Sequence, residues 1–350
     1  MDFKIGNVTF GGLRTVVIAE AGVNHLGRMD YAEELVKTAK RAGADIIKFQ
    51  TYKASKLTTK NAPRFWDWEG EHDLEGSQFD SYSILDSFGE NEYKKLIAIC
   101  EKYGIEFMST PFDEESAQML VDLGMKGFKI ASCDITNIPF LTFLAKFDLP
   151  ILLSTGASNI NEISDAIAAI EASGSGPIGV MQCTLCYPTN AQDANLRAIS
   201  TLKMKFPDKL IGFSDHTLGT IVSSASILFG VTYIEKHYTF DKTLPDSADH
   251  WLSLDERELR ELVENLRTLE LALGSDIKEK KDCEDATFKF ARRSLVSKRS
   301  IKKGDVITAD DLTAKRPGTG LAPIFKNRFV GKKVKIDIAE DSLLKLDWIE

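Results

Sequence analysis

The sequence predicts an α/β protein, a (β/α)8 TIM barrel followed by a small, mostly β domain. Eight short runs of β-branched, aromatic and other apolar residues alternate with helical segments over about 280 residues, which matches such a barrel in size and order. The runs are continuously apolar, as in parallel strands that are buried on both faces. No G-x-G-x-x-G turn follows the first run, which argues against an open doubly wound sheet.

The elements follow one another regularly along the chain. An alternating segment at 3–10, with Gly6-Asn7 at its centre, predicts a hairpin ahead of the barrel. The expected strands are 16–20, 45–50, 106–110, 128–132, 150–154, 178–183, 211–216 and 232–237. Asp30-x-x-Glu33 resembles a capping box that opens the first helix, and Gly43 closes it. Helices are also expected at 91–103, from 114 to Gly124, near 141, around 163–170 and over 255–273, and one helix plus a turn is expected over 217–231.

Residues 53–90 interrupt this alternation of strands and helices. The segment holds Trp66, Trp68, acidic residues and Gly76, with little periodicity. A loop of this length inside a compact domain is usually functional or disordered, and its aromatic residues favour an ordered lid.

Composition and net charge indicate which kinds of partner and which cellular compartment to expect. The net charge of −8 argues against nucleic acid or an anionic membrane as a partner, and no apolar run is long enough to span a bilayer. Five cysteines lack zinc-site spacing. Cys183-x-x-Cys186 could be a redox pair, but two reduced cysteines at a strand end fit better. The chain is therefore expected to be cytoplasmic with free thiols.

Polar side chains gather where the expected strands end. Because the carboxyl ends of barrel strands meet at one mouth, these residues are expected to converge there. They are Glu20, Lys48, Gln50, Ser109, Thr110, Lys129, Ser132, Asp134, Ser154, Thr155, Gln182, Thr184, Ser214, His216, Lys236 and His237.

Three kinds of chemistry are open to this set. His216 and His237 end neighbouring strands and could share a divalent metal with an open position, or could be ordinary hydrogen-bonded histidines. Lys48 and Lys129, with the hydroxyls, could cradle phosphate and carboxylate, or could pair with buried acids. Glu20 could be an ion-pair partner or a base. Asp215, beside His216, is expected to support the site rather than bind metal.

Several motifs resemble the sialic acid synthase family, and they occur in the family's order over nearly the whole chain. They are Glu20-Ala21-Gly22-Val23-Asn24-His25-x-Gly27, Lys48-Phe49-Gln50-Thr51, Ser109-Thr110-Pro111-Phe112, Lys129-Ile130-x-Ser132, Leu153-Ser154-Thr155-Gly156, Cys183-Thr184-x-x-Tyr187-Pro188, Gly212-x-Ser214-Asp215-His216-Thr217 and Ile234-Glu235-Lys236-His237. The tail, with Ile301-x-x-Gly304 and Lys315-Arg316-Pro317-Gly318, is similar to the antifreeze-like (SAF) domain that ends these synthases. The expected division is 1–276 for the barrel with its hairpin, 277–290 for a linker and 291–350 for the antifreeze-like domain.

The resemblance implies that phosphoenolpyruvate condenses with an N-acetylmannosamine-type hexosamine to give a nine-carbon 2-keto-3-deoxy acid and phosphate. It implies a divalent cation, usually Mn²⁺ with Mg²⁺ or Co²⁺ as alternatives, on His216 and His237. Phosphoenolpyruvate would be held by Lys48, Thr110, Lys129, Ser132, Ser154 and Ser214. The sugar would face Glu20, Gln50, Tyr187, Asp249 and Arg316. Arg316 would come from the second subunit of a domain-swapped homodimer. Glu20 or Asp134 would handle the attacking water.

Departures from the family pattern leave the sugar open. Asp134 stands where many members carry glutamate, and residues 245–250 depart from the usual Gly-Pro-Asp. A diacetamido-trideoxy hexose, leading to a legionaminic- or pseudaminic-type acid, is the alternative substrate. Outside this class, a metal-dependent barrel hydrolase would want a His-x-His on the first strand, where Glu20-Ala21-Gly22 stands instead. A barrel serving only as scaffold for a carbohydrate-binding tail would not need so many polar and charged residues at its strand ends.

Overall fold

The computed structural model describes residues 2–66, 76–174, 176–244 and 249–350. The chain divides into two compact units, Met1–Gly274 and Ser275–Glu350. The division falls close to the expected boundary at 276. Each unit is described by itself.

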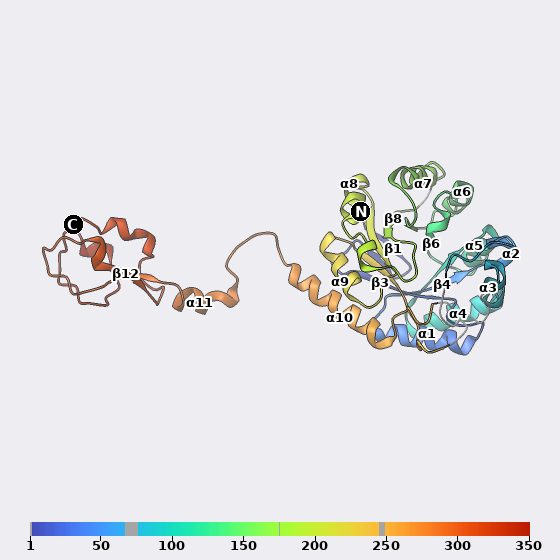
Figure 1. Ribbon diagram of the computed structural model, residues 1–350, viewed down its shortest axis with the longest axis horizontal. Helices are drawn as coiled ribbons and strands as arrows, with labels where there is room; N and C mark the ends of the chain where they lie inside the picture. The colour runs from blue at the N-terminus through green and yellow to red at the C-terminus, as the bar shows by residue number, and fades with distance from the viewer. Residues whose placement is uncertain (1, 67–75, 175, 245–248) are drawn as a thin grey trace. The chain divides into compact units, whose positions relative to one another are not determined.

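The first unit is built on one sheet of eight strands in the order β5-β4-β3-β10-β9-β8-β7-β6 (Figure 1). The strands are β3 Val16–Gly22, β4 Ile46–Thr51, β5 Glu106–Pro111, β6 Phe128–Ile130, β7 Ile151–Ser154, β8 Ile178–Cys183, β9 Leu210–Asp215 and β10 Tyr233–His237. Neighbours in this order pair in parallel. The end strands β5 and β6 lie against each other, so the sheet closes on itself. The predicted barrel is confirmed.

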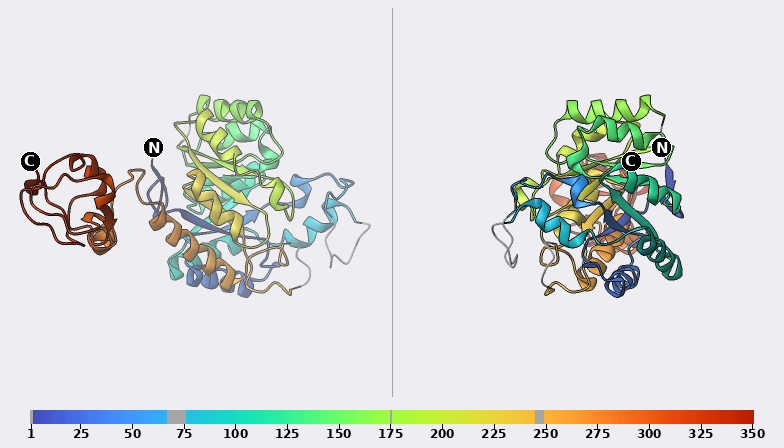
Figure 2. Two further views of the ribbon diagram at one scale, coloured as in Figure 1. Left: turned by 60° about the vertical axis from the view of Figure 1, so that its left-hand side comes forward. Right: turned by 90° about the vertical axis from the view of Figure 1, so that its right-hand side faces the viewer.

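Helices cover the outside of the barrel (Figure 2). They are α1 Met29–Ala42, α4 Glu90–Tyr103, α5 Glu114–Asp122, α6 Ile138–Ala145, α7 Ile160–Ala172, α8 Ala198–Lys205, α9 Ile221–Ser226 and α10 Glu256–Leu273. α1 buries Leu35, Val36 and Ala39 along one face, as its periodicity predicts. Gly43 and Gly104 end α1 and α4 in the left-handed conformation.

One prediction about the helices is wrong in detail. Asp30 and Glu33 form no capping box, because α1 begins earlier, with Arg28 at the N-cap position and no side-chain cap. Asp30 instead pairs with Arg28, and Glu33 accepts hydrogen bonds from Lys102 and Tyr103. The helix plus a turn expected over 217–231 is present as the short α9, continued by a 3-10 turn at Ile227–Phe229.

The amino-terminal end of the barrel is closed by apolar side chains. The predicted hairpin is present as β1 Phe3–Ile5 and β2 Val8–Phe10. Its residues pack against the side chains inside the barrel: Val16, Ile18, Ile46, Met108, Leu152, Met181 and Tyr233. A Cβ atom at Gly212 would lie 2.3 Å from the Tyr233 ring, so glycine there makes room for the tyrosine. With this end filled, the barrel can open only at the carboxyl ends of its strands.

The segment 53–90 contains helices α2 Ala54–Leu57 and α3 Gln78–Leu85. Ser77 and Asp80 form a capping box at the start of α3. Trp66 is described, whereas Trp68 lies outside the described residues.

The second unit has its own small core. Strands β11 Ser294–Ser297 and β12 Leu312–Lys315 pair antiparallel, and the rest consists of turns, short bridges and 3-10 helices. Its buried side chains include Leu295, Ile301, Phe329, Val334 and Leu344. Part of the segment expected as a linker is helical, at Asp282–Glu284 and in α11 Asp285–Phe290. In neither unit does a described helix combine the length and hydropathy of a membrane span.

Candidate active site

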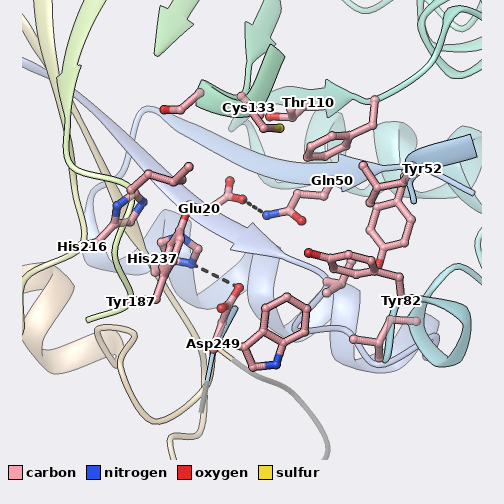
Figure 3. Close-up of a pocket in the computed structure, with 18 of the residues that line it drawn as sticks. Glu20, Gln50, Tyr52, Tyr82, Thr110, Cys133, Tyr187, His216, His237 and Asp249 are labelled. Atoms are coloured by element: carbon pink, nitrogen blue, oxygen red, sulfur yellow. Dashed lines mark hydrogen bonds and ion pairs between the residues drawn. The ribbon is translucent and has the colours of Figure 1, made fainter. Parts of the chain in front are cut away.

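A pocket of about 1130 Å³ opens at the carboxyl ends of the barrel strands (Figure 3). Of the strand-end residues expected there, Ser109, Thr155, Gln182, Thr184 and Lys236 do not line it. The lining does include the residues of the first unit to which the resemblance assigns roles: Glu20, Lys48, Gln50, Thr110, Lys129, Ser132, Asp134, Ser154, Tyr187, Ser214, His216, His237 and Asp249. They come together because side chains two residues apart on a strand face the same side, and each barrel strand turns one of its faces inward. The expected convergence of the strand ends is thus observed.

The floor of the pocket is a buried network of two lysines and two carboxylates. Lys48 Nζ lies 2.6 Å from Glu20 Oε2 and 3.9 Å from Glu235 Oε2, and donates to Thr110 Oγ1 at 2.8 Å. Lys129 Nζ lies 3.4 Å from Glu235 Oε1. The four charged side chains are each at most 5% exposed. Glu235 thus bridges lysines from two strands that are not neighbours, β4 and β6.

The protonation states in this network depend on the contacts that its side chains make with one another. Burial alone would raise the pKa of Glu235, but Lys129 and Lys48, with His237 and His216, lower that pKa to about 2. Burial would likewise lower the pKa of Lys48, but Glu20 and Glu235 raise it above its ordinary value. At neutral pH the floor therefore holds a charged Glu235 and a charged Lys48.

The structure shows one of the two alternatives for the lysines, and their contact with phosphate or carboxylate stays a prediction. They do pair with buried acids, and both also line the pocket. Sequence reasoning gave Glu235 no role in the site. The signal that could have found it is the two-residue period of β10, which puts Glu235 on the same face as His237.

Hydroxyl groups surround the charged floor. Ser214 Oγ donates to Glu235 Oε1 at 3.1 Å. Ser132 Oγ accepts from the Gly156 backbone N–H at 2.9 Å, and a Cβ at position 156 would lie 2.8 Å from that oxygen. Glycine at 156 is thus needed for this contact. The Ser154 hydroxyl faces only the Met181 sulfur, at 4.0 Å, among the described residues, so it remains a strong donor for a ligand.

The two histidines lie next to each other in the lining of the pocket. Their ring centroids lie 5.3 Å apart, and the Tyr187 ring lies 4.2 Å from that of His216. His216 Nδ1 lies 2.8 Å from the Thr184 carbonyl oxygen, which makes Nδ1 the donor and leaves the Nε2 lone pair to a ligand. His237 Nδ1 lies 3.3 Å from Asp249 Oδ2. Burial lowers and Asp249 raises the pKa of His237, and the carboxylate prevails.

This pair offers nitrogen ligands from neighbouring strands. Two imidazoles, one of them oriented by a backbone carbonyl, suit a divalent cation that completes its shell with oxygen ligands. Within the described part of the chain, no group of three or more His, Cys, Asp or Glu side chains has a metal-binding arrangement.

The two candidate bases differ in their surroundings. Glu20 accepts from Gln50 Nε2 at 2.9 Å in addition to its contact with Lys48. Asp134 accepts from Asn137 Nδ2 at 3.0 Å and lies 3.8 Å from the Cys133 sulfur. Burial raises the pKa of Asp134, and Asn137 and Cys133 offset this only in part. Among the described residues Asp134 has no lysine or arginine partner, whereas Glu20 forms an ion pair with Lys48.

Asp215 supports the site from behind it, as expected. Lys236 Nζ lies 2.9 Å from its Oδ2, and the Thr217 backbone N–H donates to its Oδ1 at 2.9 Å. Neither Asp215 nor Lys236 lines the pocket. Strand alternation explains this, because Glu235 and His237 occupy the inward positions on β10 and Lys236 the outward one.

The sugar-facing predictions divide between the two units. Gln50, Tyr187 and Asp249 line the pocket. Arg316 is an exposed residue of the second unit, directly after β12. Its role toward the sugar therefore stays a prediction.

Comparison with known proteins agrees with this architecture. The NeuB family model matches residues 35–278 and the SAF domain model matches residues 292–350. The chain is 39% identical over 338 residues to an N,N'-diacetyllegionaminic acid synthase of Legionella pneumophila, covering 95% of this chain and 94% of that protein. It is 34% identical over 340 residues to the N-acetylneuraminate-9-phosphate synthase of Mus musculus, covering 95% and 92%.

A solved structure shows the same likeness. The N-acetylneuraminic acid synthetase of Leptospira borgpetersenii, crystallised with citrate, is 34% identical and superposes with a TM-score of 0.72, covering 82% of this chain and 94% of that one. These matches confirm the resemblance read from the strand-end motifs. The chain is an enzyme of the NeuB family, the sialic-acid-type synthases, and ends in a SAF domain.

Proposed function

We propose that the enzyme condenses phosphoenolpyruvate, an N-acetylmannosamine-type hexosamine and water into a nine-carbon 2-keto-3-deoxy acid, with release of phosphate. The observation that carries this proposal is the pair of buried ammonium groups at the floor of the pocket, ringed by hydroxyls and close to two adjacent histidines. A small, multiply charged anion fits such a floor, and an aldehyde fits above it.

Phosphoenolpyruvate would be held by Lys48, Lys129 and the hydroxyls of Thr110, Ser132, Ser154 and Ser214. An ammonium group has three N–H donors. Lys129 directs contacts to Glu235 and to the Ile130 carbonyl oxygen at 3.3 Å, which leaves a donor for a ligand. Glu20 and Glu235 balance the lysine charges while the pocket is empty of substrate, so the floor stays stable before substrate binds.

His216 and His237 would hold a divalent cation, with Mn²⁺ favoured and Mg²⁺ or Co²⁺ as alternatives. Such a cation acts as a Lewis acid that polarises the sugar aldehyde. Asp249, 3.3 Å from His237 Nδ1, would fix the orientation of that ring.

In the reaction, C3 of phosphoenolpyruvate forms a bond to the aldehyde carbon of the sugar, and the aldehyde oxygen takes up a proton from water to become a hydroxyl. Positive character develops at C2, where water adds and loses a proton to Asp134. The bond between C2 and the phosphate-bearing oxygen then breaks, and the C2 hydroxyl gives its proton to the departing phosphate and becomes the ketone. Lys48 and Lys129 stabilise the departing phosphate. We assign the proton to Asp134 because Glu20 is bound to Lys48.

A second sugar is favoured by one comparison. The relative named for N,N'-diacetyllegionaminic acid is 39% identical, against 34% for the relative named for N-acetylneuraminate-9-phosphate. A diacetamido-trideoxy hexose, giving a legionaminic- or pseudaminic-type acid, is therefore the second candidate substrate.

We further propose that the enzyme acts as a domain-swapped homodimer in which Arg316 of one chain contacts the sugar bound by the other. The Arg316 loop is anchored on its own unit, since Ser294 Oγ donates to the Pro317 carbonyl oxygen at 2.6 Å and the Gly318 N–H donates to the Lys289 carbonyl oxygen at 2.9 Å. An anchored guanidinium suits an N-acetyl carbonyl or sugar hydroxyls.

The test is phosphate release from phosphoenolpyruvate in the presence of Mn²⁺. N-acetylmannosamine and diacetamido-trideoxy hexoses are each offered, with a reaction lacking sugar as the control. The proposal expects phosphate only when a hexosamine is present. Release that does not depend on sugar would indicate a hydrolase, and no release with any hexosamine would refute the proposed function.

A further inference from the structure

Asp249 reaches the site on a segment that follows β10 in the chain. Its Oδ2 lies 3.3 Å from His237 Nδ1, and Figure 3 shows the carboxylate directed at that ring. His237 Nδ1 is buried and has no hydrogen-bond partner of good geometry among the described residues. His216 differs, because the Thr184 carbonyl oxygen fixes its Nδ1. The orientation of the His237 ring therefore depends on where Asp249 is held.

This segment is attached to the end of β10 at two points. At the first, the Leu254 N–H donates to the His237 carbonyl oxygen at 2.8 Å, and the Thr239 N–H donates to the Leu254 carbonyl oxygen at 2.9 Å. The second point joins two side chains, since His250 Nδ1 lies 2.8 Å from Thr239 Oγ1. Asp249 directly precedes His250, so the side-chain contact is the one that can set its position.

His250 is buried behind the pocket. It is 1% exposed, and neither His250 nor Thr239 lines the pocket. Its neighbours in the chain, Asp249 and Trp251, both line it. Burial lowers the pKa of His250 to about 4, although Asp249 raises it, so the ring is neutral at pH 7. Since its Nε2 has no partner among the described residues, the contact with Thr239 is the polar interaction that accounts for a histidine here.

The Thr239 hydroxyl connects this histidine to the backbone beyond β10. Its Oγ1 donates to the Asp241 carbonyl oxygen at 3.2 Å and accepts from the Asp241 N–H at 3.3 Å. A threonine hydroxyl has one proton, so the ring N–H of the neutral His250 is the donor to the same oxygen. The hydroxyl thus holds His250 in a fixed place.

Other contacts of Asp249 do not replace this one. The Ser253 N–H donates to the Asp249 carbonyl oxygen at 3.0 Å, and the Ser253 hydroxyl donates to the same oxygen. These bonds lie within the segment and move with it. The backbone contact at Leu254 does tie the segment to β10, but it lies five residues further along the chain.

We propose that His250 and Thr239 form a clamp that positions Asp249 and, through Asp249, the ring of His237. Both are positioning residues, since neither lines the pocket. This inference rests on the proposed function, in which His237 holds the cation and Asp249 faces the sugar. Loosening the clamp therefore weakens the binding of cation and sugar together. Phosphoenolpyruvate, which would lie on the charged floor, is affected less.

The first measurement is the affinity for Mn²⁺ without substrates, followed by the electron paramagnetic resonance signal of free Mn²⁺. His250→Leu removes the ring nitrogens, whereas His250→Asn has almost the size of leucine and can place an amide nitrogen near the position of Nδ1. We expect His250→Leu to raise the Kd for Mn²⁺ by about tenfold, as for other residues that orient metal ligands. His250→Asn should raise it by less than about threefold, because one hydrogen bond is restored.

Thr239→Val tests the other side of the clamp. It keeps the shape of the side chain and removes the hydroxyl, so its Kd for Mn²⁺ should match that of His250→Leu. The double variant should bind Mn²⁺ no more weakly than either single variant, because both changes remove the same contact. Thr51→Val is the matched control. It removes the hydroxyl of another buried threonine at a strand end, which bonds to Ser109 at 2.6 Å outside the pocket, and it should bind Mn²⁺ as the wild type does.

Steady-state kinetics at saturating Mn²⁺ give a second readout. His250→Leu should raise the KM for the hexosamine by about tenfold and that for phosphoenolpyruvate by less than about twofold. A merely structural role would lower the Tm and change the two KM values alike.

Unchanged Mn²⁺ affinity in His250→Leu, or an equal loss in His250→Asn, would overturn the clamp and leave the proposed function intact. If His250→Leu does not fold, Thr239→Val decides by the same criterion, with wild-type affinity as the contradicting result. Failure of the wild-type protein itself to bind Mn²⁺ would instead refute the metal assignment in the proposed function, and the clamp with it.

Discussion

Replacing Glu235 by glutamine probes the network at the floor of the barrel. The change preserves shape and removes one negative charge that lies 3.4 Å from Lys129 and 3.9 Å from Lys48. At an effective dielectric constant of 20, contacts at these distances are worth roughly 5 and 4 kcal/mol. Desolvation of the carboxylate offsets much of this. In the variant, Glu20 is the one carboxylate of the network that remains to balance the charges of the two lysines.

Breaking a buried pair from one side costs about 3–5 kcal/mol, because an uncompensated charge stays behind. We therefore expect Glu235→Gln to lower the free energy of unfolding by about 3 kcal/mol at pH 7. For a unit of this size that corresponds to a fall in Tm of about 6 °C. Thermal denaturation followed by circular dichroism measures it. Phosphoenolpyruvate should raise the Tm of the variant more than that of the wild type, since the anion replaces the lost charge.

The pH dependence has a definite sign. The pKa of Glu235 is lowered from 4.5 to about 2 in the folded protein, so its carboxylate contributes stability above about pH 4.5 and loses this as the pH falls toward 2. The difference in Tm between variant and wild type should shrink over that window. Glu256→Gln is the control, because Glu256 pairs with Arg41 at 2.5 Å on the surface, where ion pairs contribute at most about 1 kcal/mol. An unchanged Tm in Glu235→Gln, or one that falls no further than in Glu256→Gln, would refute the reasoning.

Three further predictions concern the proposed roles. Lys48→Met or Lys129→Met should raise the apparent KM for phosphoenolpyruvate by about tenfold or more, well beyond the change for the sugar, and equal effects on both substrates would assign the lysines a purely structural role. His216→Ala or His237→Ala should abolish Mn²⁺-dependent activity while circular dichroism stays that of a folded barrel; normal turnover by His237→Ala after chelation would contradict the metal assignment. Arg316→Ala should weaken sugar use with little effect on phosphoenolpyruvate, and mixed with His216→Ala chains it should regain activity at one of the two sites of the mixed dimer. If subunits exchange and no activity returns, Arg316 does not act across the dimer.

Much of the site could be predicted from sequence because strand ends can be recognised from local sequence, and the barrel topology brings those ends together. Glu20, Lys48, Lys129 and His216 each lie within or directly after a mostly apolar strand, and parallel strands bring such positions to one mouth. Glu235 was missed because its importance lies in its contacts. It meets Lys48 and Lys129, which are separated from it by more than a hundred residues, and no local pattern reveals that pairing.

Side-chain capping and loop shape were less predictable. Asp30 has the spacing of a capping residue, but α1 begins after Arg28, so its carboxylate lies inside the first turn and pairs with that arginine. The rings of Tyr52 and Tyr82 lie 5.5 Å apart, although the two residues are thirty positions apart in an aperiodic segment. Without a repeating pattern, the sequence indicates that such residues are present but not which of them meet.

The bond that breaks in phosphoenolpyruvate tests the central claim most directly. The wild-type enzyme is supplied with phosphoenolpyruvate, hexosamine and Mn²⁺ in ¹⁸O-labelled water, and the released phosphate is analysed by mass spectrometry. If water adds to C2 and the carbon–oxygen bond breaks, the phosphate retains the bridging oxygen and gains no label. Phosphate carrying one ¹⁸O would mean that water attacked phosphorus. The enzyme would then be a phosphate-ester hydrolase, and the proposed condensation would be contradicted.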